Sequence, residues 1–301
     1  MRVACAWPLD QNSSILQEVK GMRNLSKTTI VGLAGVFLFA SCAAAQNKQQ
    51  TEPAPPLREG SASILDKLAN EGTGGTAPKR DLTGFWGSSV GQKINQIPPM
   101  TPWGEQVFRT HKNNSEYAVA DSNDPDNTCD PLGFPRAMVF MTRGIAFATM
   151  PDRVIQMWQY DKTWREIFTD GRPLPVNVGG TEKDAPDPRY WGYSVGHWQD
   201  DYTFIVETTG SDENTWLDNA GHPHSVAIHV TETYKRVDHN DLEVTVHIDD
   251  PKTYTKPFDI TTAHFKWIPK QDFEEQICIG SQELDYLKLI ADPGARKDAS
   301  K

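Results

Sequence analysis

The sequence predicts an all-β fold in which an antiparallel meander closes into a barrel or a strongly curved sheet, with a short C-terminal helix. The first observation is that, from residue 136 onward, short segments of alternating apolar and polar residues are separated by Asp, Asn, Gly and Pro. Such period-2 segments bounded by turn residues are typical of hairpin strands. The second is that the expected folded region spans about 210 residues, an ordinary length for one all-β domain.

The expected strands cover 136–141, 144–150, 153–160, 164–169, 190–199, 202–209, 225–237, 242–248 and 261–268. The clearest alternation is in 242–248, where Leu242, Val244, Val246 and Ile248 share one face. Residues 281–291 are expected to be helical, because apolar residues recur there at helical spacing before Pro-Gly ends the pattern.

In a simple meander, alternate connections lie at the same end of the sheet. The tight turns at 161–162, 200–201 and 238–241 then fall at one end, and the loops 170–189, 210–223 and 250–260 fall at the other. Long irregular loops in a compact domain are more often functional than short ones. We therefore expect a ligand-binding mouth at the end with the long loops.

The N-terminal region predicts export. The apolar run 30–40 is about eleven residues, shorter than the roughly 20 that span a bilayer, and it follows Arg23 and Lys27 as in a signal peptide. Met22 would open a signal peptide of ordinary length and is an alternative start. Two cleavage patterns remain open, a lipobox-like sequence that would lipidate Cys42 and an A-x-A site at 43–45.

Three parts of the chain follow from this pattern. Residues 1–45 are the expected leader, 46–80 a flexible tether rich in Pro, Gly, Ser and Gln, and 81–301 a single β-rich domain. The expected location is the periplasm, the outer membrane or the cell surface, with contact to a membrane only through an acyl group at Cys42.

Charge and cysteine content narrow the class further. The chain carries 30 basic and 40 acidic side chains, and removing the leader, which holds four basic and two acidic ones, leaves a net charge of −12. Nucleic acid is an unsuitable partner for such a chain, because phosphate binding needs clustered basic groups.

Outside the leader only Cys129 and Cys278 remain. In an oxidising compartment they are expected to form one disulfide, worth on the order of 4 kcal/mol; two separate buried thiols are the alternative.

Two resemblances add to this interpretation. The segment LTGFWG at 82–87 resembles the first strand of lipocalin-like barrels, which favours a barrel over a sandwich. The motifs YWGYSVGHW (190–198), TWLD (215–218), GHPHS (221–225) and DDPKTYTKP (249–257) resemble a family of uncharacterised exported bacterial proteins. That resemblance implies export and a single domain, and it implies no particular reaction.

The sharpest chemical feature is His222-Pro223-His224. Two imidazoles two residues apart on an extended segment point the same way, so both could bind one divalent metal such as zinc, with Asp218 as third ligand. Histidines that simply line a polar loop or bond to backbone are the alternative.

The same residues could act without a metal. His222 or His224 would exchange protons with a substrate, since imidazole titrates near neutral pH, and Asp218 and Tyr254 would assist. Further carboxylates are expected nearby at Glu207, Asp170 and Asp187. Ser194 lies in a Gly-x-Ser-x-Gly pattern, but in a strand rather than the strand-to-helix turn that a nucleophile of this type needs.

Several residues are candidates for ligand binding. Trp216 lies in a long loop beside Asp218 and His222, where an aromatic face could stack on a ligand. Arg172, Lys252 and Lys256 could receive an anionic group, and Glu207 and His197 are further candidates. Solvated surface charge is the alternative explanation for these side chains.

Three functions therefore remain open. The first is an exported enzyme that performs hydrolysis, elimination or isomerisation on a small molecule at a loop-lined barrel mouth. The second is a non-catalytic barrel that binds a small hydrophobic or sugar ligand. The third is a structural lipoprotein of the envelope.

Overall fold

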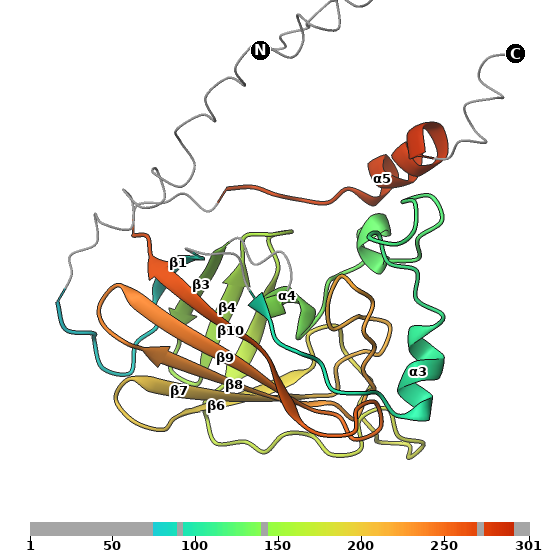
Figure 1. The fold of residues 1–301 in the computed structure, drawn as a ribbon. Helices are drawn as coiled ribbons and strands as arrows, with labels where there is room; N and C mark the ends of the chain where they lie inside the picture. The colour runs from blue at the N-terminus through green and yellow to red at the C-terminus, as the bar shows by residue number, and fades with distance from the viewer. Residues whose placement is uncertain (1–74, 89–92, 140–143, 270–273, 292–301) are drawn as a thin grey trace, which may run out of the picture. The chain divides into compact units, whose positions relative to one another are not determined.

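A computed structural model describes residues 75–88, 93–139, 144–269 and 274–291. Within them, nine strands close into a mixed β-barrel, which confirms the predicted all-β barrel (Figure 1). The predicted leader 1–45, its alternative start Met22, the lipidation site Cys42 and most of the tether 46–80 lie outside the described residues. The strands of the barrel are β1 (Gly84–Ser88), β3 (Gly144–Thr149), β4 (Arg153–Trp158), β5 (Trp164–Phe168), β6 (Tyr193–Trp198), β7 (Thr203–Thr209), β8 (His229–Arg236), β9 (Asp241–Asp249) and β10 (Phe258–Trp267). The short β2 (Lys93–Ile94) is an additional strand outside this ring.

Short helical segments accompany the barrel. They are α3 (Pro102–Phe108), the 3-10 helix η1 (Pro125–Thr128), α4 (Arg136–Val139), α5 (Gly280–Tyr286) and the π-helical η2 (Leu287–Ala291). The expected helix at 281–291 is thus confirmed. None of the helices in the described part of the chain has the length and apolar character that a membrane crossing requires.

The barrel closes through β1. Its strands follow the order β1-β3-β4-β5-β6-β7-β8-β9-β10, and β1 pairs back onto β10 with Trp86 opposite Trp267. The short β2 pairs with another part of β10, with Ile94 opposite Thr261. Closure leaves none of the nine ring strands as an exposed edge.

One joint departs from the predicted antiparallel meander. The strands β5 and β6 are parallel and share only two register pairs, Ile167↔Ser194 and Phe168↔Val195. The segment 169–192 between them is long enough for the return that a parallel connection requires. The prediction was wrong at this joint because period-2 alternation shows which residues form strands but not the direction in which neighbours run.

The parallel joint reassigns the ends of the barrel. Since every other pairing in the ring is antiparallel, the turn at 161–162 lies at the same end as the loops after β7 and β9, not with the turns after β6 and β8 as predicted. The segment 169–192 begins at the tight-turn end and returns to the long-loop end. Figure 1 shows α3 and η1 at that end too.

The strands bury alternate side chains, as their sequence pattern predicted. In β9, Leu242, Val244, Val246 and Ile248 are buried, and their intervening neighbours are partly exposed. Large side chains point into the interior: Trp86, Trp158, Phe147, Phe204, Tyr234 and Phe265 are all buried. The interior is therefore a packed core rather than a cargo cavity.

The segment 136–141 was expected to be a strand, but Arg136–Val139 forms the short helix α4. All four residues are buried. The Ala137 amide donates to Gly133 and the Met138 amide to Pro135. A short apolar run buried on every side has no periodicity that separates strand from helix.

The predicted first strand is confirmed as β1. The Trp86 indole donates to the Leu82 carbonyl at 2.9 Å, and the Arg236 guanidinium lies 4.9 Å above its ring. Gly84 has a φ of +132°, and a Cβ there would lie 2.5 Å from the Trp267 ring nitrogen. Only glycine fits at this closing point of the barrel.

A polar network crosses the barrel interior. Arg165 on β5 donates to Glu232 on β8 at 2.5 Å and to the Gln156 oxygen at 2.9 and 2.7 Å. The Tyr234 hydroxyl donates to Glu232, and the Phe134 ring lies 3.9 Å from the guanidinium carbon. Both charges of the ion pair are buried. This network was not predicted, although the inward positions of Gln156 and Glu232 follow from strand parity.

The cysteines pair as predicted. The sulfur atoms of Cys129 and Cys278 lie 2.03 Å apart, the distance of a disulfide bond. Cys129 directly follows η1, and the Cys278 amide donates to the Asp161 carboxylate. The C-terminal segment is therefore attached to the long-loop end of the barrel.

Replacing Glu232 with Gln is expected to destabilise the fold by about 3 kcal/mol, because Arg165 would keep a buried charge without its counter-ion. Urea unfolding followed by circular dichroism measures this loss. Glu243→Gln on the outer face of β9 is the matched control and should change stability by less than about 0.5 kcal/mol. A loss equal to that of the control would show that the buried ion pair does not stabilise the barrel.

Candidate functional site

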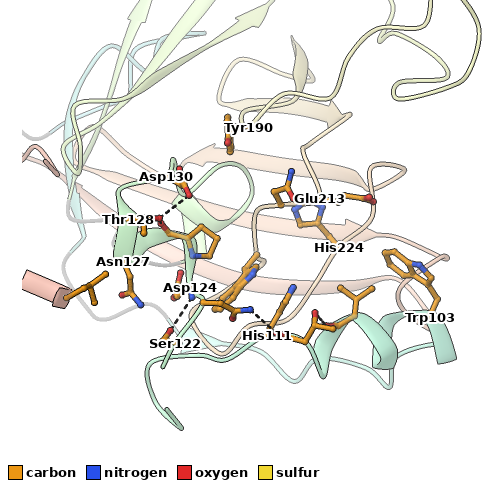
Figure 2. A pocket seen from close by; sticks show the side chains of 17 residues that line it. Trp103, His111, Ser122, Asp124, Asn127, Thr128, Asp130, Tyr190, Glu213 and His224 are labelled. Atoms are coloured by element: carbon orange, nitrogen blue, oxygen red, sulfur yellow. Dashed lines mark hydrogen bonds between the residues drawn. The ribbon is translucent and has the colours of Figure 1, made fainter. Parts of the chain in front are cut away.

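A cleft of about 710 Å³ lies at the long-loop end, outside the packed interior (Figure 2). It is formed by α3, the segment that leads to η1, and the loop after β7. Its lining is Trp103, Val107, Thr110, His111, Ser122, Asn123, Asp124, Pro125, Asn127, Thr128, Asp130, Tyr190, Glu213, Asn214, Trp216, His224 and Leu287. We refer to it as the histidine cleft.

Local sequence rules explain why α3 borders this cleft. The Thr101 hydroxyl accepts from the Gly104 amide at the helix N-terminus, and Pro102 occupies the first turn. The Thr101 hydroxyl also donates to the Lys252 carbonyl at 2.6 Å. Gly104 is packed so closely that a Cβ would lie 2.6 Å from the Thr253 carbonyl. The helix is thereby held against the loop after β9.

His111 follows α3 and presents an imidazole to the cleft. Its Nδ1 donates to the Gly221 carbonyl at 2.7 Å, and its ring stacks on Trp216 with 4.7 Å between centroids. Burial lowers the pKa of His111 below its usual 6.5, so the ring is neutral at pH 7. With Nδ1 carrying the proton, Nε2 keeps its lone pair, and it has no hydrogen-bond partner among the described residues.

Trp216 is clamped between two groups. His111 stacks on its ring, and the Arg136 guanidinium lies 5.3 Å from the ring centroid. Arg136 makes two 2.8 Å hydrogen bonds to the buried Asp124 carboxylate, which itself lines the cleft. Trp216, predicted to contact ligand, therefore does belong to the cleft lining, where it forms a rigid wall.

His222 and Asp218 form an oriented pair. The His222 Nδ1 donates to the Asp218 carboxylate at 2.7 Å, and the backbone amides of Ala220 and His222 donate to the other carboxylate oxygen. Asp218 is buried, His222 is partly exposed, and its ring stacks on Phe108 at 5.1 Å. This is the arrangement in which a carboxylate fixes the tautomer of a catalytic histidine. The His222 Nε2 has no bonded partner in the described part of the chain.

His224 is placed differently from the prediction. It is completely buried, with Nδ1 against the Ser225 carbonyl at 3.1 Å and Nε2 against the Thr215 hydroxyl at 2.8 Å. Burial lowers its pKa below 6.5. The residues 221–225 are not a strand, so the two-residue spacing does not aim both imidazoles at one point. His224 stabilises the loop, and it borders the cleft only as part of the cleft wall.

The proposed metal triad of His222, His224 and Asp218 is not assembled as a ligand set. Both ring nitrogens of His224 are engaged, and Asp218 is engaged with His222. Over the described residues, no group of three His, Cys, Asp or Glu side chains is arranged to hold a metal ion. Nothing in the geometry of these side chains therefore supports zinc or another divalent metal here.

Tyr254 has a structural position. Its hydroxyl donates to the Pro223 carbonyl at 2.7 Å, and the side chain is buried. Burial raises its pKa far above the ordinary value of 10. Tyr254 therefore positions the loop that carries His222 and does not face a substrate.

The remaining candidates lie elsewhere. His197 is exposed on β6, and Glu207 on β7 lies 3.6 Å from His229, so both are on the outer face of the barrel. Lys256 is exposed in the loop after β9. Lys252 lies 4.1 Å from the Trp103 ring at the rim of the histidine cleft. Arg172 pairs with Asp170 in a different cleft, described below.

Two other predicted residues take structural roles. The Ser194 hydroxyl is buried in β6 and bonds to Thr208 at 2.8 Å, so it is no exposed nucleophile. The Asp187 side chain is exposed, and its backbone carbonyl accepts from Tyr193. Neither residue reaches the histidine cleft.

Sequence reasoning missed His111, Asp124, Arg136 and Glu213. The Thr101-Pro102 helix start was a usable signal that a helix precedes His111. No sequence spacing, however, relates His111 to Gly221 or Asp124 to Trp216, because those contacts depend on tertiary packing.

The fold and the site together define a closed mixed β-barrel with a packed interior and a histidine cleft outside it. No family model, curated protein or solved structure matches the chain. The resemblance to a family of exported bacterial proteins therefore stays a prediction.

The buried neutral state of His224 has a consequence for stability. Its pKa is lowered on folding, so below about pH 6.5 the unfolded chain binds a proton that the folded chain does not. The free energy of unfolding should therefore fall as the pH drops from 7 towards 5, and His111 contributes in the same direction.

The measurement is urea unfolding at pH 7, 6 and 5 for the wild type and for His224→Gln. The variant is expected to be less stable at pH 7, because it loses two buried hydrogen bonds, but to show a shallower dependence by up to about 1.4 kcal/mol per pH unit. Equal slopes in the two proteins would contradict the assignment of His224 as a buried neutral group.

Proposed function

We propose that the protein is an enzyme that carries out acid–base chemistry on a small polar molecule in the histidine cleft. One observation carries this proposal. The loop 218–222 anchors two imidazoles through Nδ1, His222 by the Asp218 carboxylate and His111 by the Gly221 carbonyl. In both rings Nε2 remains the atom that could exchange a proton with a bound molecule.

His111 is the base in this proposal. It lines the cleft and is neutral at pH 7, so its Nε2 can accept a proton from a substrate held against Trp103 and Tyr190. The rigid stacking on Trp216 and the fixed Nδ1 bond orient the ring before a substrate arrives, which lowers the entropic cost of the reaction.

His222 is the second anchored imidazole. The Asp218 carboxylate holds Nδ1 of this ring, which leaves Nε2 as the atom that a substrate can reach. His222 is outside the cleft lining, so its part in the reaction depends on how far a substrate extends past Phe108. Separate substitutions of His111 and His222 show which of the two takes part in the reaction.

The chemistry needs no nucleophile from the chain. The cleft lining offers carboxylates at Asp130 and Glu213, and hydroxyl and amide groups at Ser122 and Asn127. Such groups suit hydrolysis by an activated water, elimination or isomerisation of a polar substrate. The lining also includes apolar side chains such as Trp103, Val107 and Leu287, so the proposal of a polar substrate rests on the polar groups beside His111.

We further propose that the protein works in an oxidising compartment outside the cytoplasm. The disulfide between Cys129 and Cys278 supports this location, since such bonds persist mainly in exported proteins. It joins the C-terminal segment, which contributes Leu287, to the η1 side of the histidine cleft.

Turnover of a panel of p-nitrophenyl esters, compared with imidazole at equal concentration, tests the catalytic proposal. His111→Ala is expected to lower kcat/KM by about 10²-fold or more, the usual contribution of a general base. His222→Ala and Asp218→Asn should lower it together if the dyad takes part.

The matched control is His247→Ala. His247 donates from Nδ1 to the Asp259 carboxylate at 2.7 Å, the same geometry as the dyad, but the pair is exposed on the outer wall of the barrel. This variant should keep wild-type turnover. If folded His111→Ala and His222→Ala both keep it too, or if His247→Ala loses as much, the acid–base proposal is wrong.

A further inference from the structure

A second cleft opens where β5 and β6 run parallel. These strands share only two register pairs, and the cleft is lined by residues of both strands and of the segment between them. The cleft at this seam has a volume of about 740 Å³. We refer to it as the seam cleft. It is separate from the proposed reaction site, and Tyr190 lines both.

The walls of the seam cleft are aromatic. Trp164 is 56 % exposed and Tyr190 is 38 % exposed, although large aromatic side chains are usually buried. Phe168, Trp191 and Tyr193 complete the aromatic lining, and Pro173, Pro175 and Pro188 add rigid apolar surface. Flat, partly exposed rings of this kind suit a planar apolar ligand.

Arginines accompany the rings. The Arg172 guanidinium lies 3.6 Å from the Phe168 ring centroid, and that of Arg189 lies 4.2 Å from the Tyr193 centroid. Arg172 is paired with Asp170, whereas Arg189 makes no ion pair with any described carboxylate. The nearby Asp212 carboxylate accepts from the Asn214 backbone and side chain instead. Arg189 is thus a cation held beside an aromatic wall in an otherwise acidic protein.

The base of the cleft is polar. Arg165 and Ser194 line it, and both are buried. The Nε and Nη2 atoms of Arg165 are committed to Gln156 and Glu232, while Nη1 makes only long contacts, 3.4 Å to Ser194 and 3.3 Å to Thr208. Hydrogen bonds of that length are weak, but they use both Nη1 hydrogens, so the base of the seam cleft is a polar surface that Arg165 and Ser194 share.

We propose that the seam cleft binds an aromatic carboxylate, with its ring against Trp164 and Trp191 and its carboxylate received by Arg189. The combination of stacked guanidinium groups and flat apolar walls matches both halves of such a molecule. The charge of Arg165 at the base is balanced by Glu232, so the preference for an anion over a neutral isostere rests on Arg189.

Calorimetric titration of the full chain with 2-naphthoate tests the proposal, with 2-naphthamide as the neutral isostere. Saturable binding of naphthoate is expected, with at least about tenfold weaker binding of the amide. Arg189→Gln should weaken naphthoate binding about tenfold and remove most of the preference for the anion. Trp164→Ala should weaken both ligands severalfold. Both side chains are exposed, so the fold should persist, and circular dichroism checks it.

Trp103→Ala is the matched control, since Trp103 carries a stacked cation, Lys252, in the histidine cleft. It should leave naphthoate affinity unchanged. The proposal is overturned if naphthoate shows no saturable binding up to about 10 mM, if the amide binds equally well, or if Trp103→Ala rather than Arg189→Gln abolishes binding. Ester turnover is measured separately. The seam-cleft proposal can therefore be wrong while the proposed enzyme activity stands, and the activity proposal can be wrong while the seam cleft still binds naphthoate.

Discussion

The buried pair of Arg165 and Glu232 is the interaction on which the arrangement of the molecule depends. It links β5 to β8 across the interior and is completed by Gln156 and Tyr234. Two charges removed from water are tolerated only when each finds a complete set of partners, so the surrounding strands must hold their register. The interior of the described barrel is packed with side chains, and the two large clefts described above open at its end and at its seam.

The parallel joint between β5 and β6 determines where those surfaces are. It sends the segment 169–192 back to the long-loop end, where Arg189 bridges to Ser211 and the Phe134 amide donates to the Tyr190 carbonyl. Gly133 makes this approach possible, because a Cβ there would lie 2.8 Å from that carbonyl. The same joint leaves the seam open, so one topological feature forms a boundary of both clefts.

Much of the barrel was predictable because strand alternation is local. The inward faces of β4 and β9 follow from period 2, and the Cys129–Cys278 pair follows from composition once export is assumed. The direction of β6 was not predictable, since parallel and antiparallel neighbours share one alternation pattern. At the site, Asp218 and His222 were correctly associated because they lie four positions apart in one loop. The prediction placed His224 wrongly, because hydrogen bonds to Thr215 and Ser225 hold its ring inside the loop. It missed His111, because the hydrogen-bond partner of that residue, Gly221, lies far away in sequence.

Tyr190 has a position that neither cleft explains alone. Its side chain lines both, and its backbone carbonyl is fixed by Phe134, whose ring packs on the Arg165 guanidinium. The dividing wall is therefore continuous with the ion-pair network in the interior. The two clefts therefore share one boundary residue, and its backbone position depends on the packing of Phe134 against the core.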